Sequence, residues 1–443
     1  MATLVSSIES SSPQAPEAGF AALAAREIQL SRLLIAYISA GLFFMLLPGT
    51  FFGVLNLIAI SHNRAAGTVS AAWVQAHGHA QIFGWIGTFI LGIGYHSIPK
   101  LRRMKPFGLW APWTTWTLWV TGVTLRWACG VYEWQWRILM PLSAILELAA
   151  FLIFIFTISG HRSEKNPQKL DDWILVVIAG CIGWAGALAI NLVMAIFLAW
   201  RGESLVLPHN FDQRFLVLQT WGFLVPFIWG FSAKWLSVFL GLKSPHTRLL
   251  RWAVVFNTAG VLVALIGIMK PAAALLAIGI TAAIFALRLF ELPERPAKTG
   301  GVHTSFPLFV RLAFLWAVVA AALGIWASLT ATAPGIWGAS RHALTVGFVA
   351  MMVFAIGQRI LPAFSGMRLL FSTKTMFLAL LCLAVGCALR VSAEILSYQN
   401  FAPSAWRWLP VSAITEMTAV ALFAANILIT FVKPRPAKSS DAA

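Results

Sequence analysis

The chain has 443 residues, of which 59% are hydrophobic and only 11% are charged, and its mean hydropathy is +0.81. Its 21 Trp residues are typical of the aromatic belts that proteins place at membrane interfaces. These values exclude an ordinary soluble globular protein and favour a multi-pass protein surrounded by a lipid bilayer.

Twelve continuous apolar stretches are each long enough to cross a bilayer as a helix, because about 20 residues are needed to span the hydrocarbon. The runs do not alternate as strands do, so we predict an all-α polytopic membrane protein. In chain order the stretches are roughly 31–60, 75–98, 107–128, 136–160, 172–200, 213–242, 247–269, 271–290, 304–332, 339–363, 372–393 and 405–432.

The stretches group into three blocks of four helices. Polar segments at 161–171 and 291–303 separate the blocks and are predicted to be linkers. Residues 1–30 are rich in Ser, Ala, Pro and Glu in their first part and are predicted to be a disordered cytoplasmic tail. The predicted repeats cover 31–160, 172–290 and 304–432, and residues 433–443 form a second cytoplasmic tail.

The net charge of +17 does not indicate a nucleic-acid partner, because the Lys and Arg residues lie in the loops between helices. Loops on the side of the two termini carry more than twice as many of them as the opposite loops. The positive-inside rule therefore places both termini in the cytoplasm, as expected for a protein of a bacterial inner membrane.

The first and third blocks repeat a local pattern. His79 in helix 2 and His342 in helix 10 are each followed by Gly after five residues and by Pro after twenty, whereas helix 6 has Val217 at this position. Two further correspondences support the repeat: Arg126 in helix 3 with Arg390 in helix 11, and Glu147 in helix 4 with Glu416 in helix 12.

The repeat places the imidazoles of His79 and His342 at the same depth in two equivalent helices. An intramembrane imidazole needs a partner, and a pair of them suits the axial ligation of haem iron. The alternative is that both rings only hydrogen-bond neighbouring helices. His77 points about 200° away from His79 around the helix, so either residue could be the helix 2 ligand.

Several other polar residues have two interpretations. Arg341 could neutralise a haem propionate or extend to the membrane interface. Glu147 and Glu416 could relay protons or serve symmetric packing. The four Cys residues contain no Cys-x-x-Cys pair, which argues against a disulfide framework or a zinc site.

The segments His77-Gly-His-Ala-Gln-Ile-Phe-Gly84 and Arg341-His-Ala-Leu-Thr-Val-Gly347 resemble the NnrS family of bacterial membrane proteins, as does the stretch running on to Arg359. The resemblance implies a protein that contains haem, of b type, and in which copper is possible. It also implies a role linked to nitric oxide and nitrosative stress. An acidic residue often follows the second His in this family, whereas this chain has Ala80.

The family looks like a distant relative of the haem-copper oxidases and nitric oxide reductases. That relationship implies twelve helices in three arcs, with a low-spin haem between helices 2 and 10 near the outer surface. The copper site of that superfamily uses a helix 6 His and paired His residues on helix 7, whereas this chain has Val217 and a single His246. His209, in the loop before helix 6, is the nearest substitute for a metal ligand.

From the sequence we therefore expect a haem protein that binds nitric oxide, senses it or transfers electrons, with a quinol or a protein as electron donor. Two alternatives stay open. One is a reductase with turnover of nitric oxide or oxygen at a second metal site. The other is a twelve-helix proton-coupled transporter without a cofactor, in which Glu147 and Glu416 move protons.

Overall fold

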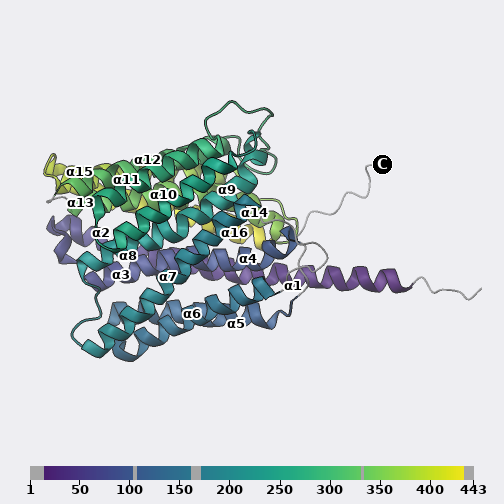
Figure 1. The fold of residues 1–443 in the computed structure, drawn as a ribbon, viewed down its shortest axis with the longest axis horizontal. Coiled ribbons are helices and arrows are strands. Elements are labelled where there is room, and N and C mark those ends of the chain that lie inside the picture. The colour runs from purple at the N-terminus through teal and green to yellow at the C-terminus, as the bar shows by residue number, and fades with distance from the viewer. Residues whose placement is uncertain (1–13, 103–106, 161–170, 331–333, 434–443) are drawn as a thin grey trace, which may run out of the picture.

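The computed structural model describes residues 14–102, 107–160, 171–330 and 334–433. Within these ranges the regular structure is entirely helical, and the long helices lie side by side along one common direction (Figure 1). The chain crosses the length of this bundle twelve times, so the start of the first helix and the end of the last lie at the same end of the molecule (Figure 1).

Four of the twelve crossings are divided by a π-helical segment. The first block consists of α1–η1–α2 (Gln14–Phe44, Met45–Phe51, Phe52–Asn63), α3–η3–α4 (Ala71–His79, Ala80–Gly87, Thr88–Leu101), α5 (Trp110–Tyr132) and α6 (Trp136–Gly160). The second consists of α7 (Asp172–Arg201), α8–η4–α9 (His209–Val217, Leu218–Leu224, Val225–Leu240), α10 (Thr247–Leu265) and α11 (Met269–Leu287). The third consists of α12 (Phe306–Leu329), α13–η5–α14 (Pro334–His342, Ala343–Ala350, Met351–Phe364), α15 (Thr373–Tyr398) and α16 (Trp408–Val432). Two short 3-10 helices, η2 (Ala66–Thr68) and η6 (Pro403–Arg407), lie before α3 and α16.

The predicted all-α architecture is confirmed, and each predicted stretch corresponds to one crossing. Within the described residues, eleven crossings are both long and apolar enough to span a membrane. The remaining one, α5, has 23 residues, but its Thr residues and Arg126 lower its hydropathy. The protein is therefore a multi-pass membrane protein.

The N-terminal region differs from the expected disordered tail. Helix α1 begins at Gln14, so most of the segment 1–30 is helical rather than disordered. The many Ala residues of this segment, together with Glu and Leu, have high helix propensity. Residues 1–13, 161–170 and 434–443 lie outside the described residues, and the first linker and most of the second tail fall there.

The second linker is described, and it packs against the end of α9. The backbone N–H of Glu294 donates to the Gly241 carbonyl at 2.9 Å, and that of Lys298 donates to the Phe239 carbonyl at 2.9 Å. These bonds satisfy carbonyl groups at the helix end that have no partner within the helix.

The π-helical segments appear at the same register in helices 2, 6 and 10. η3 starts directly after His79, η4 directly after Val217, and η5 directly after His342. These are the three positions that the repeat aligns in the sequence. A π-helical turn adds a residue to the turn and often occurs at functional sites. Its recurrence at these three positions therefore supports the repeat. It also indicates that the segments directly after His79 and His342 are candidates for a functional site.

Blocks one and three also share a close helix contact. A Cβ atom on Gly122 of α5 would lie 2.9 Å from Cγ of Glu147 in α6. A Cβ atom on Gly386 of α15 would lie 2.7 Å from Cγ of Glu416 in α16. Glycine therefore lets each carboxylate side chain lie between two helices, as small residues do in membrane bundles.

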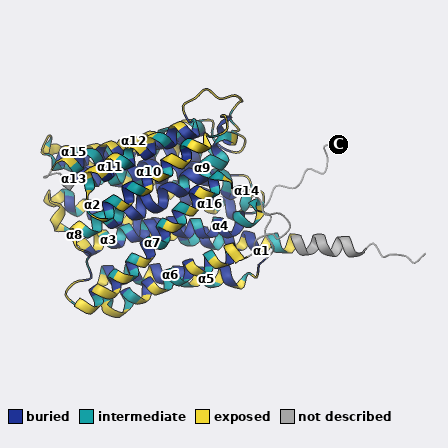
Figure 2. Ribbon diagram, viewed as in Figure 1, coloured by how far each residue is buried: buried dark blue, intermediate teal, exposed yellow. Residues whose placement is uncertain are grey.

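The most buried parts of the ribbon lie in the helices at the middle of the bundle, and exposed residues occur along the outer helices (Figure 2). Trp119, Trp184 and Trp229 are fully buried. Large apolar residues such as Trp200 and Ile182 are 79% and 68% exposed on α7. Such exposure is expected where a helix faces lipid tails rather than water.

Candidate haem-binding site

His77 lies in the last turn of α3 and is held by helix 1. Its Nδ1 is 2.9 Å from the carbonyl oxygen of Gly49 in η1. A carbonyl oxygen can only accept, so Nδ1 carries the ring proton and Nε2 keeps a free lone pair. The ring also needs Gly53, because a Cβ atom there would lie 2.7 Å from its Cε1.

His342, the last residue of α13, shows the same arrangement of its ring nitrogens. Its Nδ1 is 2.9 Å from the carbonyl oxygen of Gly338 on the preceding turn, and 3.4 Å from Oε2 of Glu394 on α15. The proton is therefore on Nδ1, and Nε2 again keeps its lone pair. The side chain of His342 is 27% exposed.

His79 is arranged differently. Its Nε2 is 2.8 Å from Oε1 of Glu147 on α6, and both side chains are buried. The ring contacts Phe83 one turn deeper, with a centroid separation of 4.8 Å. Its Nε2 is therefore engaged by a carboxylate of the same block, and the lone pair is left on Nδ1.

His77 lies within electrostatic range of helix 10. Its neighbours at that range are His342 and Arg390, from helices 10 and 11. The two rings with free Nε2 atoms thus belong to one region, bordered by helices 1, 2, 10 and 11.

A cation with unused hydrogen-bonding capacity lies beside this region. Arg390 of α15 is 6% exposed, and its Nη2 is 3.3 Å from Oε2 of Glu394. Within the part of the chain that the structure describes, its Nε and Nη1 atoms have no hydrogen-bond partner. A buried guanidinium with unused donors is costly, and an anionic group such as a carboxylate would satisfy it.

These residues fit a haem group. The imidazoles of His77 and His342, whose Nε2 atoms have no hydrogen-bond partner among the described residues, would hold the iron, and each Nδ1–H is fixed by an acceptor, as is usual for metal-ligating His. The unused donors of Arg390 suit a propionate. Neither Gly49, which orients His77, nor Glu394 was identified from the sequence. The spacing of Arg390 and Glu394 by four residues, one helical turn, was the available signal.

Arg341, for which the sequence left a propionate contact and the membrane interface open, contacts helix 6. Its Nη1 is 2.7 Å from Oε1 of Gln213 on α8, and Asp212 and Glu394 lie within electrostatic range. Because neighbouring residues on a helix point roughly 100° apart, Arg341 lies on a different face from His342. It links helix 10 to helix 6 at the end of the bundle that carries the His residues.

His209, the suggested metal ligand, is exposed at the start of α8, with Asp212 as its charged neighbour. Among the described residues there is no group of three or more His, Cys, Asp or Glu side chains that could hold a metal ion. The residues therefore do not fit a three-ligand copper centre of the kind that the sequence left possible.

The two mid-helix carboxylates have different environments. Glu147 binds His79 as described above, and its Oε2 has no hydrogen-bond partner within the described chain. Glu416 is in contact with Gly386, and its Oε1 likewise has no partner among the described residues. The repeat has thus conserved the position of the carboxylate, while only one of the two is bonded to the imidazole of its block.

Comparison with known proteins gives matches at the level of family and fold. The family model described as "NnrS protein" matches residues 34–435. A solved structure of a haem-copper terminal oxidase dimer has the same fold, with a TM-score of 0.67 and 14% sequence identity, and the match covers 93% of this chain and 86% of that one. No curated protein matches the sequence.

Proposed function

The chain belongs to the NnrS family, and on that premise we propose that it is a membrane haem protein whose iron is held by His77 and His342. The observation that supports the proposal is that the rings of His77 and His342 are hydrogen-bonded through the same nitrogen. Each donates Nδ1–H to a backbone carbonyl, at 2.9 Å in both cases, and each has no hydrogen-bond partner for Nε2 among the described residues. His79, which the sequence repeat favoured, has its Nε2 at Glu147.

The chain's own residues would hold the group in three ways. Gly49 and Gly338 orient the two imidazoles through their carbonyl oxygens. Gly53 provides the space for the ring of His77. Arg390 supplies the donors that a propionate of b-type haem requires.

The haem would supply a one-electron redox couple and an iron that can bind nitric oxide. Two His ligands would suit electron transfer. We propose that the protein acts in the response to nitric oxide or nitrosative stress through these properties. Its electrons would come from a membrane quinol or a donor protein.

The charge distribution supports a location in the cytoplasmic membrane of a bacterium with both termini in the cytoplasm. In that orientation, His77 and His342 lie towards the periplasmic ends of helices 2 and 10. Tagging the two termini and measuring which side of an intact cell reacts with an impermeant reagent tests this orientation.

The ligand assignment is tested by the visible spectrum of the purified protein. The wild type should show a Soret band, and its low-spin signature should be lost in His77→Ala and in His342→Ala. His79→Ala is the matched control in the same helix and should keep the spectrum. Gel filtration establishes that each variant is folded, and added imidazole should restore the low-spin spectrum of the two ligand variants.

A colourless wild-type protein that binds no added haem would overturn the proposal. A spectrum that depends on His79 but not on His77 would still show that the protein binds haem, but it would overturn the assignment of His77 as the ligand. Addition of nitric oxide to the reduced protein then tests the proposed chemistry, because binding shifts the Soret band.

A further inference from the structure

A cavity of about 140 Å³ lies between helices 2, 6 and 10, deeper in the bundle than the proposed haem ligands. Its walls come from η3 and α4, from η4 and α9, and from η5 and α14. Representative lining residues are Ile86, Phe89, Leu224, Phe227, Val349 and Met352. All six are buried, and none belongs to the site described above.

The chemistry of the walls excludes ordered water. Of the nineteen lining residues, only Ser97 and Ser232 carry a polar side chain apart from the indole of Trp235. The hydroxyl of Ser97 already donates to the Ile93 carbonyl of its own helix, at 2.6 Å. Buried water needs about two to four polar partners, so most of this cavity is dry.

The size of the cavity limits what can enter it. An engineered cavity of about 150 Å³ lined by Leu, Ile and Phe in another protein stays empty of water and binds benzene or xenon. A space of this size suits small apolar molecules better than a long lipid or isoprenoid chain. Phe227, Leu236 and Met352 are buried and close its inner part, whereas its outer part is open between the helices, where lining residues such as Ile228 and Ile356 are partly exposed.

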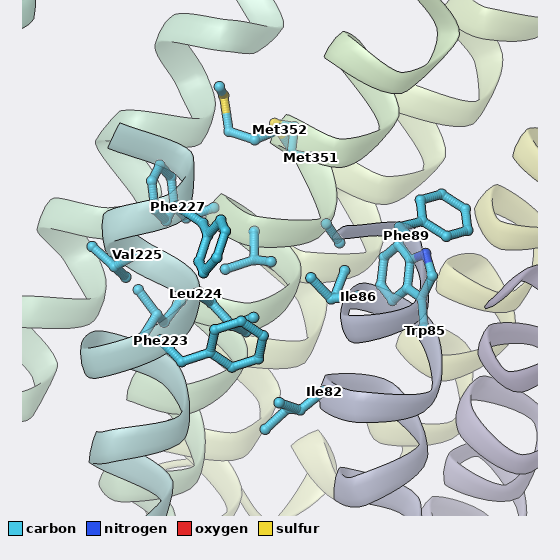
Figure 3. Close-up of a cluster of buried hydrophobic side chains, with 14 of the residues drawn as sticks. Ile82, Trp85, Ile86, Phe89, Phe223, Leu224, Val225, Phe227, Met351 and Met352 are labelled. Atoms are coloured by element: carbon cyan, nitrogen blue, oxygen red, sulfur yellow. The ribbon is translucent and has the colours of Figure 1, made fainter. Parts of the chain in front are cut away.

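The cavity begins where the three π-helical segments end. Ile86 lies in η3, Leu224 is the last residue of η4, and Val349 lies in η5. In Figure 3, Ile82 and Ile86 point across the interior toward the helix that carries Phe223 and Leu224. Val349 follows His342 by seven residues, so this end lies about 10 Å deeper along the helix that carries the ligand.

We infer that this cavity is a binding site for small apolar gas molecules, of which nitric oxide is the one that the proposed function supplies. Because helices 2 and 10 also carry the proposed haem ligands, gas molecules bound in this cavity would be held close to the proposed haem site. The inference rests on the proposed function only for the identity of the natural gas, because binding of an inert gas does not depend on haem.

Xenon is the probe that tests the cavity. Structure determination under xenon pressure, or ¹²⁹Xe chemical-shift measurements on the full-length protein, should place xenon between α4, α9 and α14. Val353→Phe inserts a ring from the lining of the cavity and should remove this site. Val238→Phe is the matched control on α9, because Val238 is 45% exposed and does not line the cavity.

A wild-type cavity that contains ordered water or a lipid chain, or that takes up no xenon, would overturn the inference. Loss of xenon binding to the same extent in Val238→Phe would also overturn it. Xenon binding in a protein that binds no haem would support the gas site and would contradict the proposed function instead. In the haem-loaded protein, Val353→Phe should slow the binding of nitric oxide while leaving the low-spin spectrum unchanged.

Discussion

His79 and His342 occupy the same register of two repeated blocks, yet their rings are bonded through different nitrogens. His79 uses Nε2, which lies 2.8 Å from Oε1 of Glu147. His342 uses Nδ1, which lies 2.9 Å from the Gly338 carbonyl. Two positions that the sequence makes equivalent therefore have different chemical properties.

The proposed ligand in helix 2 is His77 rather than His79, because the ring of His77 is bonded through the same nitrogen as that of His342 and lies within electrostatic range of it. The free nitrogen of an imidazole is the one that can bind iron, and the bond made by the other nitrogen decides which one is free. In the first block, the bond to Glu147 uses the nitrogen that His342 keeps free. His77, two residues earlier on the same helix, is the residue whose ring matches that of His342, with Nδ1 bonded to a carbonyl.

Gly53→Ala should disturb the proposed haem site without removing a ligand. The added Cβ atom would lie 2.7 Å from Cε1 of His77, so the ring must shift. We expect an altered low-spin spectrum, measured as changed g values in electron paramagnetic resonance. Gly186→Ala is the matched control, because its nearest side-chain atom would be 3.9 Å away. Identical spectra for wild type and Gly53→Ala would contradict the contact between His77 and iron.

Arg390→Met should weaken haem binding by about 10- to 100-fold, because a hydrogen bond to a charged group contributes about 1.5–3 kcal/mol. The measurement is a titration of the haem-free protein with haem. Arg126→Met is the control, since Arg126 is the counterpart of Arg390 in block one and is also buried. Equal losses of affinity in both variants would show that the effect is structural.

Glu147→Leu should lower the free energy of unfolding by about 1–3 kcal/mol, because it leaves the buried Nε2 of His79 without a partner. Glu416→Leu, the matched change in block three, should cost less, since Oε1 of Glu416 has no hydrogen-bond partner in the described structure. Thermal unfolding of both variants in detergent measures the difference. A larger loss in Glu416→Leu would contradict the assigned partners.

Asn426→Ala should destabilise the contact between helices 10 and 12. Its side chain is buried, with Nδ2 donating to Oε1 of Gln358 at 2.6 Å and to the Ser372 carbonyl at 3.0 Å. Each buried group left unsatisfied costs about 1–3 kcal/mol, so the melting temperature should fall measurably. Asn63→Ala removes an exposed hydrogen bond within one helix and should have little effect. Similar melting temperatures for the two variants would contradict the role of this network.

Much of the architecture could be predicted because lipid imposes it. A backbone inside a bilayer must satisfy its own hydrogen bonds, so each long apolar run has to be a helix. The runs in the sequence therefore fixed the order of the twelve crossings, and their ends differ from the structure by only a few residues in most cases. The start of α1 at Gln14 was missed because polarity was taken to indicate disorder, whereas helix propensity favours a helix there.

The candidate site was only partly predictable. His77, His79 and His342 could be identified because imidazoles are rare and costly inside apolar helices. Gly49, which fixes the ring of His77, contributes only a backbone carbonyl, and every residue has one. Glu394 lies in helix 11 and comes near His342 only through the packing of helix 10 against helix 11.

The sequence by itself determined the class of protein, the number and order of its helices and the repeat that relates helix 2 to helix 10, because hydropathy and spacing are properties of the chain alone. Only the tertiary structure decided which imidazole nitrogens are free. His77 and His79 point to opposite sides of one helix, and the neighbours on each side, Gly49 and Glu147, come from helices 1 and 4. Their hydrogen bonds exist only once those helices have packed together.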